Sequence, residues 1–120
     1  MNVADACELI NRYRGSAVTA TFVVHQVTSG QPDLVGRLQT SGRVVEARAS
    51  SPHLFELTMA GVSSHHRLML RTRNRELVWY ADSERLVITE RTDSRLEVVA
   101  ELTFGVHSGA DMQFGLTVSN

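Results

Sequence analysis

Five histidines and several serines are the residues of this chain that could carry metal or nucleophilic chemistry. His65 and His66 are neighbours, so in an extended segment their side chains point to opposite faces and do not easily share one metal ion. His25, His53 and His107 are joined to them by no His-x-His or His-x-x-x-His spacing. The sequence therefore predicts no metal site.

The segment from His107 to Asp111 contains a histidine, a serine and an aspartate, which are the residue types of a catalytic triad. Adjacent residues of one turn rarely reach the geometry of a triad, and Gly109 followed closely by an aspartate is typical of a hairpin turn. Cys7 is the only cysteine, so neither an internal disulfide nor a Cys-x-x-Cys site exists. We expect no catalytic residue, no cofactor and a protein that is not an enzyme.

All twelve basic residues are arginines, which excludes a Schiff-base lysine and a P-loop lysine. The net charge of -1 creates no overall attraction to nucleic acid. A short basic stripe lacks flanking aromatic residues and consists of Arg67, Arg71, Arg73 and Arg75. We expect this stripe to be a solvated surface, with an acidic protein partner as the alternative, and we expect no nucleic-acid binding.

The first fifteen residues have the pattern of one amphipathic helix. Asn2 can cap a helix whose third residue is Asp5, and Gly15 can end it. The apolar residues at helical spacing are Val3, Ala6, Cys7, Ile10 and Tyr13. The spacing predicts a helix over about residues 3–14 that covers a sheet.

From about residue 17 to 118, apolar and polar residues alternate with the period of a β-strand. The two clearest runs, which begin at Leu96 and Met112, are expected to form a hairpin with Phe104 opposite Phe114. The alternation changes parity after residue 42, which a bulge at Gly42 explains and a tight turn there would also explain.

Short loops of about two to five residues separate the other runs, and each loop length keeps the apolar faces aligned. For example, the loops place Ala47 across from Leu57, and Leu70 across from Leu77. The sequence therefore predicts one domain over residues 1–120 with a mainly β fold. The fold is an antiparallel meander of eight or nine strands, curled into a barrel or half-barrel, with one N-terminal α-helix.

A barrel of this size is either filled by its own side chains or holds one small ligand, and the topology does not choose between the two. Trp79 is expected inside and Tyr80 outside. The residues expected to line the apolar interior are Phe22, Leu38, Val45, Leu57, Leu70, Trp79, Ile88, Leu102 and Phe114. They also fit a simple packed core.

Several segments are similar to those of a known family. They are residues 18–22, 42–48, Pro52 with Phe55, 77–80 and 86–89. Their order after an N-terminal helix resembles the periplasmic lipoprotein-carrier (LolA-like) family of lipid-binding half-barrels. The chain departs from that family in a longer spacing between Arg48 and Pro52, a missing glutamine near Phe22 and fewer final strands.

The resemblance implies a curved sheet whose apolar concave face, partly shielded by a helix, receives acyl chains or the apolar segment of another protein. We therefore predict a non-enzymatic binding domain for a hydrophobic ligand, either a lipid or a lipoprotein acyl chain. The alternative is a protein-interaction or assembly module with a fully packed barrel core. Such a module would bind another protein through an edge strand or the arginine-rich face.

No apolar run approaches the ~18 residues of a transmembrane helix, so we expect no transmembrane segment. No export signal precedes the helix. The sequence leaves the compartment open: the chain as written would be cytoplasmic, and it would be periplasmic or otherwise extracytoplasmic if Met1 replaces a removed signal.

Overall fold

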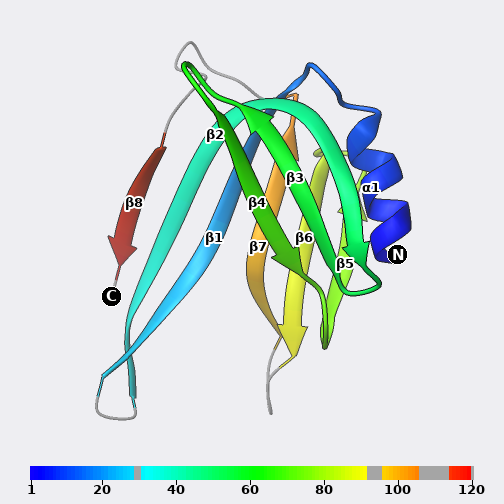
Figure 1. The fold of residues 1–120 in the computed structure, drawn as a ribbon. Coiled ribbons are helices and arrows are strands. Elements are labelled where there is room, and N and C mark those ends of the chain that lie inside the picture. The colour runs from blue at the N-terminus through cyan, green and yellow to red at the C-terminus, as the bar shows by residue number, and fades with distance from the viewer. Residues whose placement is uncertain (29–30, 92–95, 106–113, 120) are drawn as a thin grey trace.

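The computed structural model describes residues 1–28, 31–91, 96–105 and 114–119, with side chains described for 1–23, 37–91 and 97–105. The elements are α1 (Val3–Asn11), β1 (Ala17–Thr28), β2 (Gln31–Ser51), β3 (Leu54–Ala60), β4 (His65–Arg71), β5 (Arg75–Tyr80), β6 (Arg85–Arg91), β7 (Leu96–Phe104) and β8 (Phe114–Ser119). Figure 1 shows one helix beside a strongly curved sheet. The predicted class, mainly β with one N-terminal helix, is confirmed.

The strands form one antiparallel sheet in the order β4-β3-β2-β1-β7-β6-β5, and β8 pairs with β2. Two runs of consecutive strands, β1–β4 and β5–β7, are therefore joined by the pairing of β1 with β7. β4 and β5 follow each other in the sequence but form the two edges of this order. The sheet is not closed, so the structure is an open, curled sheet.

The predicted hairpin of the last two strands is wrong. β7 pairs with β1, where Phe104 lies opposite Val18, and β8 pairs with β2, where Phe114 lies opposite Thr40. The reason is that β7 already has β6 on its other side, which leaves it no free side for β8. The predicted turn at residues 107–111 lies outside the described residues.

β2 bends where it leaves β1 and begins to pair with β3. At Gly42, a Cβ atom would lie 2.6 Å from the carbonyl oxygen of Ala60, so only glycine fits without a shift of the backbone. The irregularity in the pairing with β3 falls between Val44 and Glu46. Val44 is therefore buried, with 2% exposure, and Val45 is 36% exposed. The prediction that Val45 faces inward is wrong, because the bulge lies three residues later than expected.

A second bulge changes the face of β7. The pairing with β6 shifts between Ile88 and Thr89, so Val99 is the extra residue and Val98 is 43% exposed instead of facing inward. The predicted register of Ala47 across from Leu57 is confirmed. Leu70 does not pair with Leu77, because they lie on the two edge strands.

The helix forms as its sequence predicts but ends at Asn11, three residues early. The Asn2 side chain and the Asp5 side chain bond each other's backbone N–H in a capping box, at 2.8 and 3.3 Å. At the other end, the Asn11 side chain accepts from the Ala47 N–H at 2.8 Å and donates to the Ala47 carbonyl at 2.9 Å. Asn11 therefore binds β2 at Ala47, four residues beyond Arg43, where the pairing of β2 with the first residue of β1 stops.

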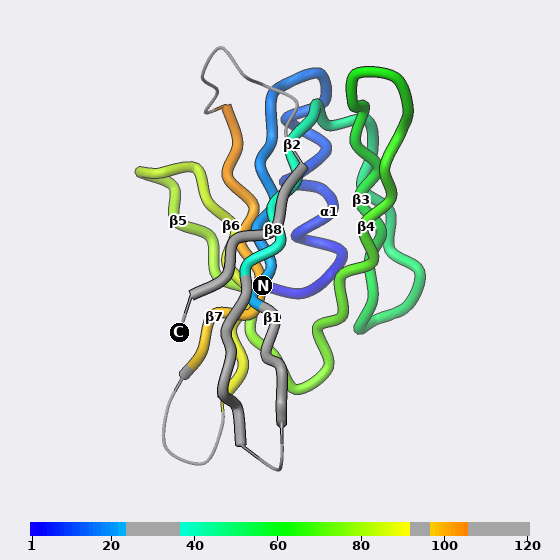
Figure 2. Tube along the Cα trace, turned by 90° about the vertical axis from the view of Figure 1, so that its left-hand side faces the viewer, coloured from blue at the N-terminus to red at the C-terminus, as the bar shows by residue number. Residues whose placement is uncertain are grey.

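The sheet curls into two facing walls, one of β5, β6 and β7 and the other of β3 and β4 (Figure 2). The helix lies against the second half of β2 and against β3. Its buried residues, Val3, Ala6, Cys7 and Ile10, belong to the same core as the inner faces of the walls. Of the helices in the described part of the chain, none is long and apolar enough to cross a membrane.

Candidate functional site: a hollow between the two walls

A hollow of about 300 Å³ lies between the walls, near the turn that joins β4 to β5. We call this the open end of the sheet. Its lining comes from five strands and consists of Phe22, Val23, Met69, Leu70, Arg71, Arg75, Ile88, Glu90, Val99 and Ala100. The volume is at the lower end of the range of small-molecule sites.

Apolar side chains form the floor of the hollow. Ala100 of β7 lies between its cross-strand partners Phe22 of β1 and Ile88 of β6. Leu70 reaches the hollow from β4, on the other wall. Val99, the extra residue of the β7 bulge, also lines the hollow. These five side chains are apolar, so the floor can bury hydrocarbon.

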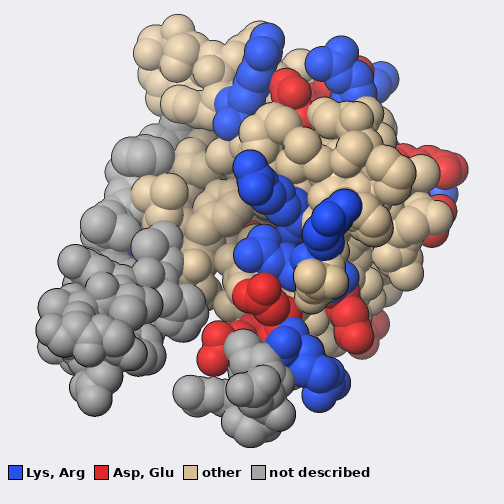
Figure 3. Space-filling model, turned by 60° about the horizontal axis from the view of Figure 1, so that its bottom comes forward, with Lys and Arg blue, Asp and Glu red and all other residues tan. Residues whose placement is uncertain are grey.

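Three charged residues stand at the rim: Arg71, Arg75 and Glu90. The Arg75 guanidinium lies 3.9 Å from the Glu90 carboxylate and donates to the Arg71 carbonyl at 3.1 Å. The Arg71 side chain is exposed and has no hydrogen bond or ion pair with any residue that the structure describes. Basic and acidic side chains gather at this end of the molecule (Figure 3).

The opposite end of the interior, which we call the closed end, is filled by the protein's own side chains. Tyr13, which follows the helix, stacks on Phe104 with ring centroids 4.7 Å apart, and Trp79 lies 6.0 Å from both rings. Leu57 and Leu102 are fully buried in the same core. The interior is therefore packed at the helix side and hollow at the other.

The predicted lining residues divide between these two ends. Phe22, Leu70 and Ile88 line the hollow. Leu57, Trp79 and Leu102 belong to the packed core or contact it. Leu38 is half-buried opposite Phe22, Val45 is on the outer face, and the side chain of Phe114 is outside the described set.

Sequence reasoning missed Val99 and the charged rim, and it left Ala100 out of the predicted lining. Val99 lies at a bulge, which the alternating pattern does not reveal. Ala100 was expected to face inward, but its small size is what leaves room beside it. Arg71 and Arg75 were expected on a solvated face, and only the curl of the sheet brings them to the same rim as Glu90.

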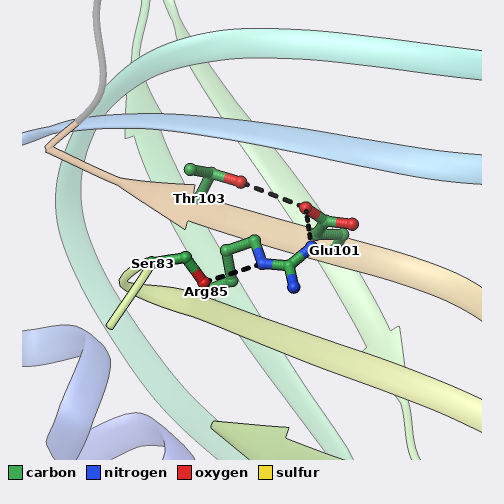
Figure 4. A network of polar contacts seen from close by, with 4 residues as sticks. All are labelled: Ser83, Arg85, Glu101 and Thr103. Atoms are coloured by element: carbon green, nitrogen blue, oxygen red, sulfur yellow. Dashed lines mark hydrogen bonds and ion pairs between the residues drawn. The ribbon is translucent and has the colours of Figure 1, made fainter. Parts of the chain in front are cut away.

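The outer face of the sheet carries an ordered polar network of different character. Arg85 donates from Nε to the Ser83 hydroxyl at 2.9 Å and from Nη1 to Glu101 at 3.2 Å (Figure 4). Thr103 donates to the same carboxylate oxygen at 3.4 Å. The Arg85 guanidinium also lies 5.1 Å from the centre of the Tyr80 ring. Its Nε and Nη1 atoms both donate within the network and the Glu101 carboxylate balances its charge, so we interpret this network as structural.

Among the residues with described side chains, the pKa is displaced at Cys7 and Tyr13, and neither residue lines the hollow. Burial raises the pKa of the Cys7 thiol. Burial also raises the pKa of Tyr13, the nearby Glu84 carboxylate adds to this rise, and Arg12 opposes it. Both groups therefore stay neutral near pH 7 and serve packing. Within the described ranges, no three histidine, cysteine or acidic side chains come together as a metal site.

Comparison of the chain with protein-family models, with curated proteins and with solved structures finds no match. The resemblance to the lipoprotein-carrier family stays a prediction.

Proposed function

We propose that this protein is a non-enzymatic binding domain that holds a hydrocarbon chain in the hollow at its open end. The observation that carries the proposal is the apolar floor of Phe22, Leu70, Ile88, Val99 and Ala100, which the helix leaves uncovered while it fills the other end. A lipid or an acyl chain attached to a lipoprotein would supply such a hydrocarbon chain.

The energetics support a ligand of modest size. Each methylene group taken from water contributes about 0.8 kcal/mol. A site of about 300 Å³ holds one short or medium chain and is small for a lipid with two long chains. Because the walls already face each other, binding requires little reorganisation of the backbone.

The test is a calorimetric titration with 1-decanol, which has an apolar chain and no charge. We expect saturable binding of one molecule per chain. Ala100→Leu should weaken it about tenfold or more, because the added methyl groups extend between Phe22 and Ile88 and occupy the floor. Ala81→Leu, in the exposed β5–β6 turn, is the matched control and should leave the affinity unchanged.

Circular dichroism before titration confirms that each variant is folded. Equal affinities of the two variants and the wild type would contradict the proposal, as would the absence of any saturable binding to the folded wild type.

The alternative of an assembly module predicts that the edge strands pair with another chain. β4 is one free edge of the sheet order, but its exposed positions include His65, Arg67 and Arg71, and charge on an edge strand opposes pairing with a second copy. Only Met69 is a large exposed apolar residue on this strand. The charge pattern therefore favours the ligand-binding proposal, and a concentration-dependent dimer in light scattering would favour the alternative.

A further inference from the structure

The open sheet has two free edges that differ in charge. Among the strands that the structure describes, β4 pairs only with β3, and β5 pairs only with β6. One turn joins these two edge strands, yet they lie on separate walls (Figure 2). The exposed residues of β4 are His65, Arg67, Met69 and Arg71, whereas those of β5 are Glu76 and Tyr80. One free edge is therefore basic, and the exposed charge on the other is acidic.

The exposed side chains of β4 share the outer face of the sheet. Leu70 is 3% exposed and faces the interior. The alternation of the strand therefore places Arg67, Met69 and Arg71 on the opposite, outer face. Arg71 meets the rim of the hollow through its backbone carbonyl, which accepts from the Arg75 guanidinium at 3.1 Å. Met69 is 50% exposed and lies between the two outer arginines along the strand.

The sheet neutralises only part of the positive charge on this edge. The Glu56 carboxylate lies 3.5 Å from the Arg67 guanidinium and 4.0 Å from that of Arg48, so one acid serves two arginines. The Arg71 guanidinium makes no hydrogen bond or ion pair with any residue that the structure describes. Arginines on an edge strand oppose pairing with a second copy, because like charges would meet. The same arginines favour a strand of opposite charge.

We propose that the free edge of β4 binds an extended acidic segment of another protein, which adds to the sheet as a further strand. The segment carries an apolar side chain beside Met69 and an acidic side chain two residues to either side, beside Arg67 and Arg71. Its intervening residues point to the inner face, where half-buried Leu68 offers apolar surface. Main-chain hydrogen bonds supply the affinity, and the alternate side chains supply the specificity. This inference is independent of the proposed function, because neither arginine side chain lies in the hollow.

Fluorescence anisotropy with a labelled peptide that contains the sequence Glu-Val-Leu-Val-Glu tests the proposal. We expect saturable binding that weakens as salt is added, because charge pairs at an exposed edge are screened. A peptide with lysine in place of both glutamates should bind about tenfold more weakly or worse, since like charges would then meet. The glutamate peptide N-methylated at its leucine and both valines keeps the charge but lacks the ladder donors in either register. It should also bind about tenfold more weakly.

Substitutions and hydrogen exchange locate the binding edge. Arg71→Gln should weaken binding of the glutamate peptide about three- to fivefold, because one charge pair across the two strands is lost. Arg91→Gln removes an equally exposed arginine of β6, on the other wall, and should change the affinity less than twofold. Circular dichroism confirms that both variants are folded. When the peptide binds the wild type, the backbone amides of β4 should exchange more slowly and those of β5 should not.

Each contrary result overturns a stated part of the proposal. Equal binding of the glutamate and lysine peptides would show that the partner is not selected by acidic charge. Equal binding of the N-methylated peptide would show that no strand is added, and slower exchange in β5 instead of β4 would show that the edge is wrong. The absence of saturable binding to the folded wild type would overturn the whole inference. The titration with 1-decanol reports on the hollow separately, so that failure would leave the proposed function standing.

Discussion

Gly42 is the residue on which the bend of β2 depends. A side chain there would meet the backbone oxygen of Ala60, which a rotamer change cannot move away. We expect Gly42→Ala to lower the free energy of unfolding by about 1–3 kcal/mol, as overpacking does in other cores, in a urea titration.

Gly61→Ala is the matched control for this substitution. Its Cβ atom would come closest to the His66 imidazole, a side chain that can rotate away, so we expect a smaller loss than at Gly42. A loss at Gly61 equal to or larger than that at Gly42 would contradict the account of the bend.

Burial of Cys7 makes the stability depend on pH above its ordinary pKa of 9.0. The folded-state pKa is raised, so above pH 9 the unfolded chain loses the thiol proton more readily than the folded chain does. The free energy of unfolding should therefore be constant from pH 7 to about 8.5 and then fall, by at most about 1.4 kcal/mol per pH unit for one group.

In Cys7→Ala, the free energy of unfolding should fall less steeply between pH 8.5 and 9.5 than in the wild type. Its free energy of unfolding at pH 7 should be lower than that of the wild type, because the substitution leaves a small cavity. The pKa of Tyr13 is also raised, so the free energy of unfolding should still fall near and above pH 10 in both proteins. Identical slopes of the wild type and Cys7→Ala near pH 9 would refute the assignment to Cys7.

At the scale of the element, Asn11 joins the helix to the sheet. Its amide bonds both the N–H and the carbonyl of Ala47, so Asn11→Ala leaves two partly buried backbone groups without these partners. We expect a loss of about 1–3 kcal/mol in the free energy of unfolding, measured by urea titration.

The neighbouring Arg12→Ala provides the comparison. Arg12 makes only an exposed ion pair with Glu8 at 3.7 Å, and exposed pairs contribute about 0–1 kcal/mol. The link between helix and sheet would be disproved if Asn11→Ala cost no more than Arg12→Ala.

Local patterns predicted the elements better than their pairing. The Asn2–Asp5 capping box and the alternation through β3 to β7 are properties of neighbouring residues, and the sequence displays them directly. The pairing of β1 with β7 joins residues some eighty positions apart, such as Val18 and Phe104, so no turn length indicates it. A bulge such as that at Val45 reverses which residues of the strand face solvent, and the types of residue in the sequence give no sign of it. This is why the alternating pattern placed Val45 inside.

At the scale of the whole molecule, the interior has two different ends. The closed end is packed around Phe104 and Trp79 together with Tyr13, and the open end leaves a floor around Ala100. Sequence alone predicted which side chains are apolar and share a face, and it named Phe22, Leu70 and Ile88. It could not predict that the walls stay apart only at one end, because that depends on where the helix docks and where β2 bends.

The central claim is that a hydrocarbon chain occupies the open end and not the packed core. It is tested most directly by measuring nuclear Overhauser effects between bound 1-decanol and methyl-labelled protein. The account predicts contacts from the chain to the methyl groups of Leu70, Ile88 and Val99, and none to those of Leu57 and Leu102. Contacts to Leu57 or Leu102, or to the methyl groups of Val3 beside a second hollow of about 300 Å³ at the helix start, without contacts to Ile88, would contradict it.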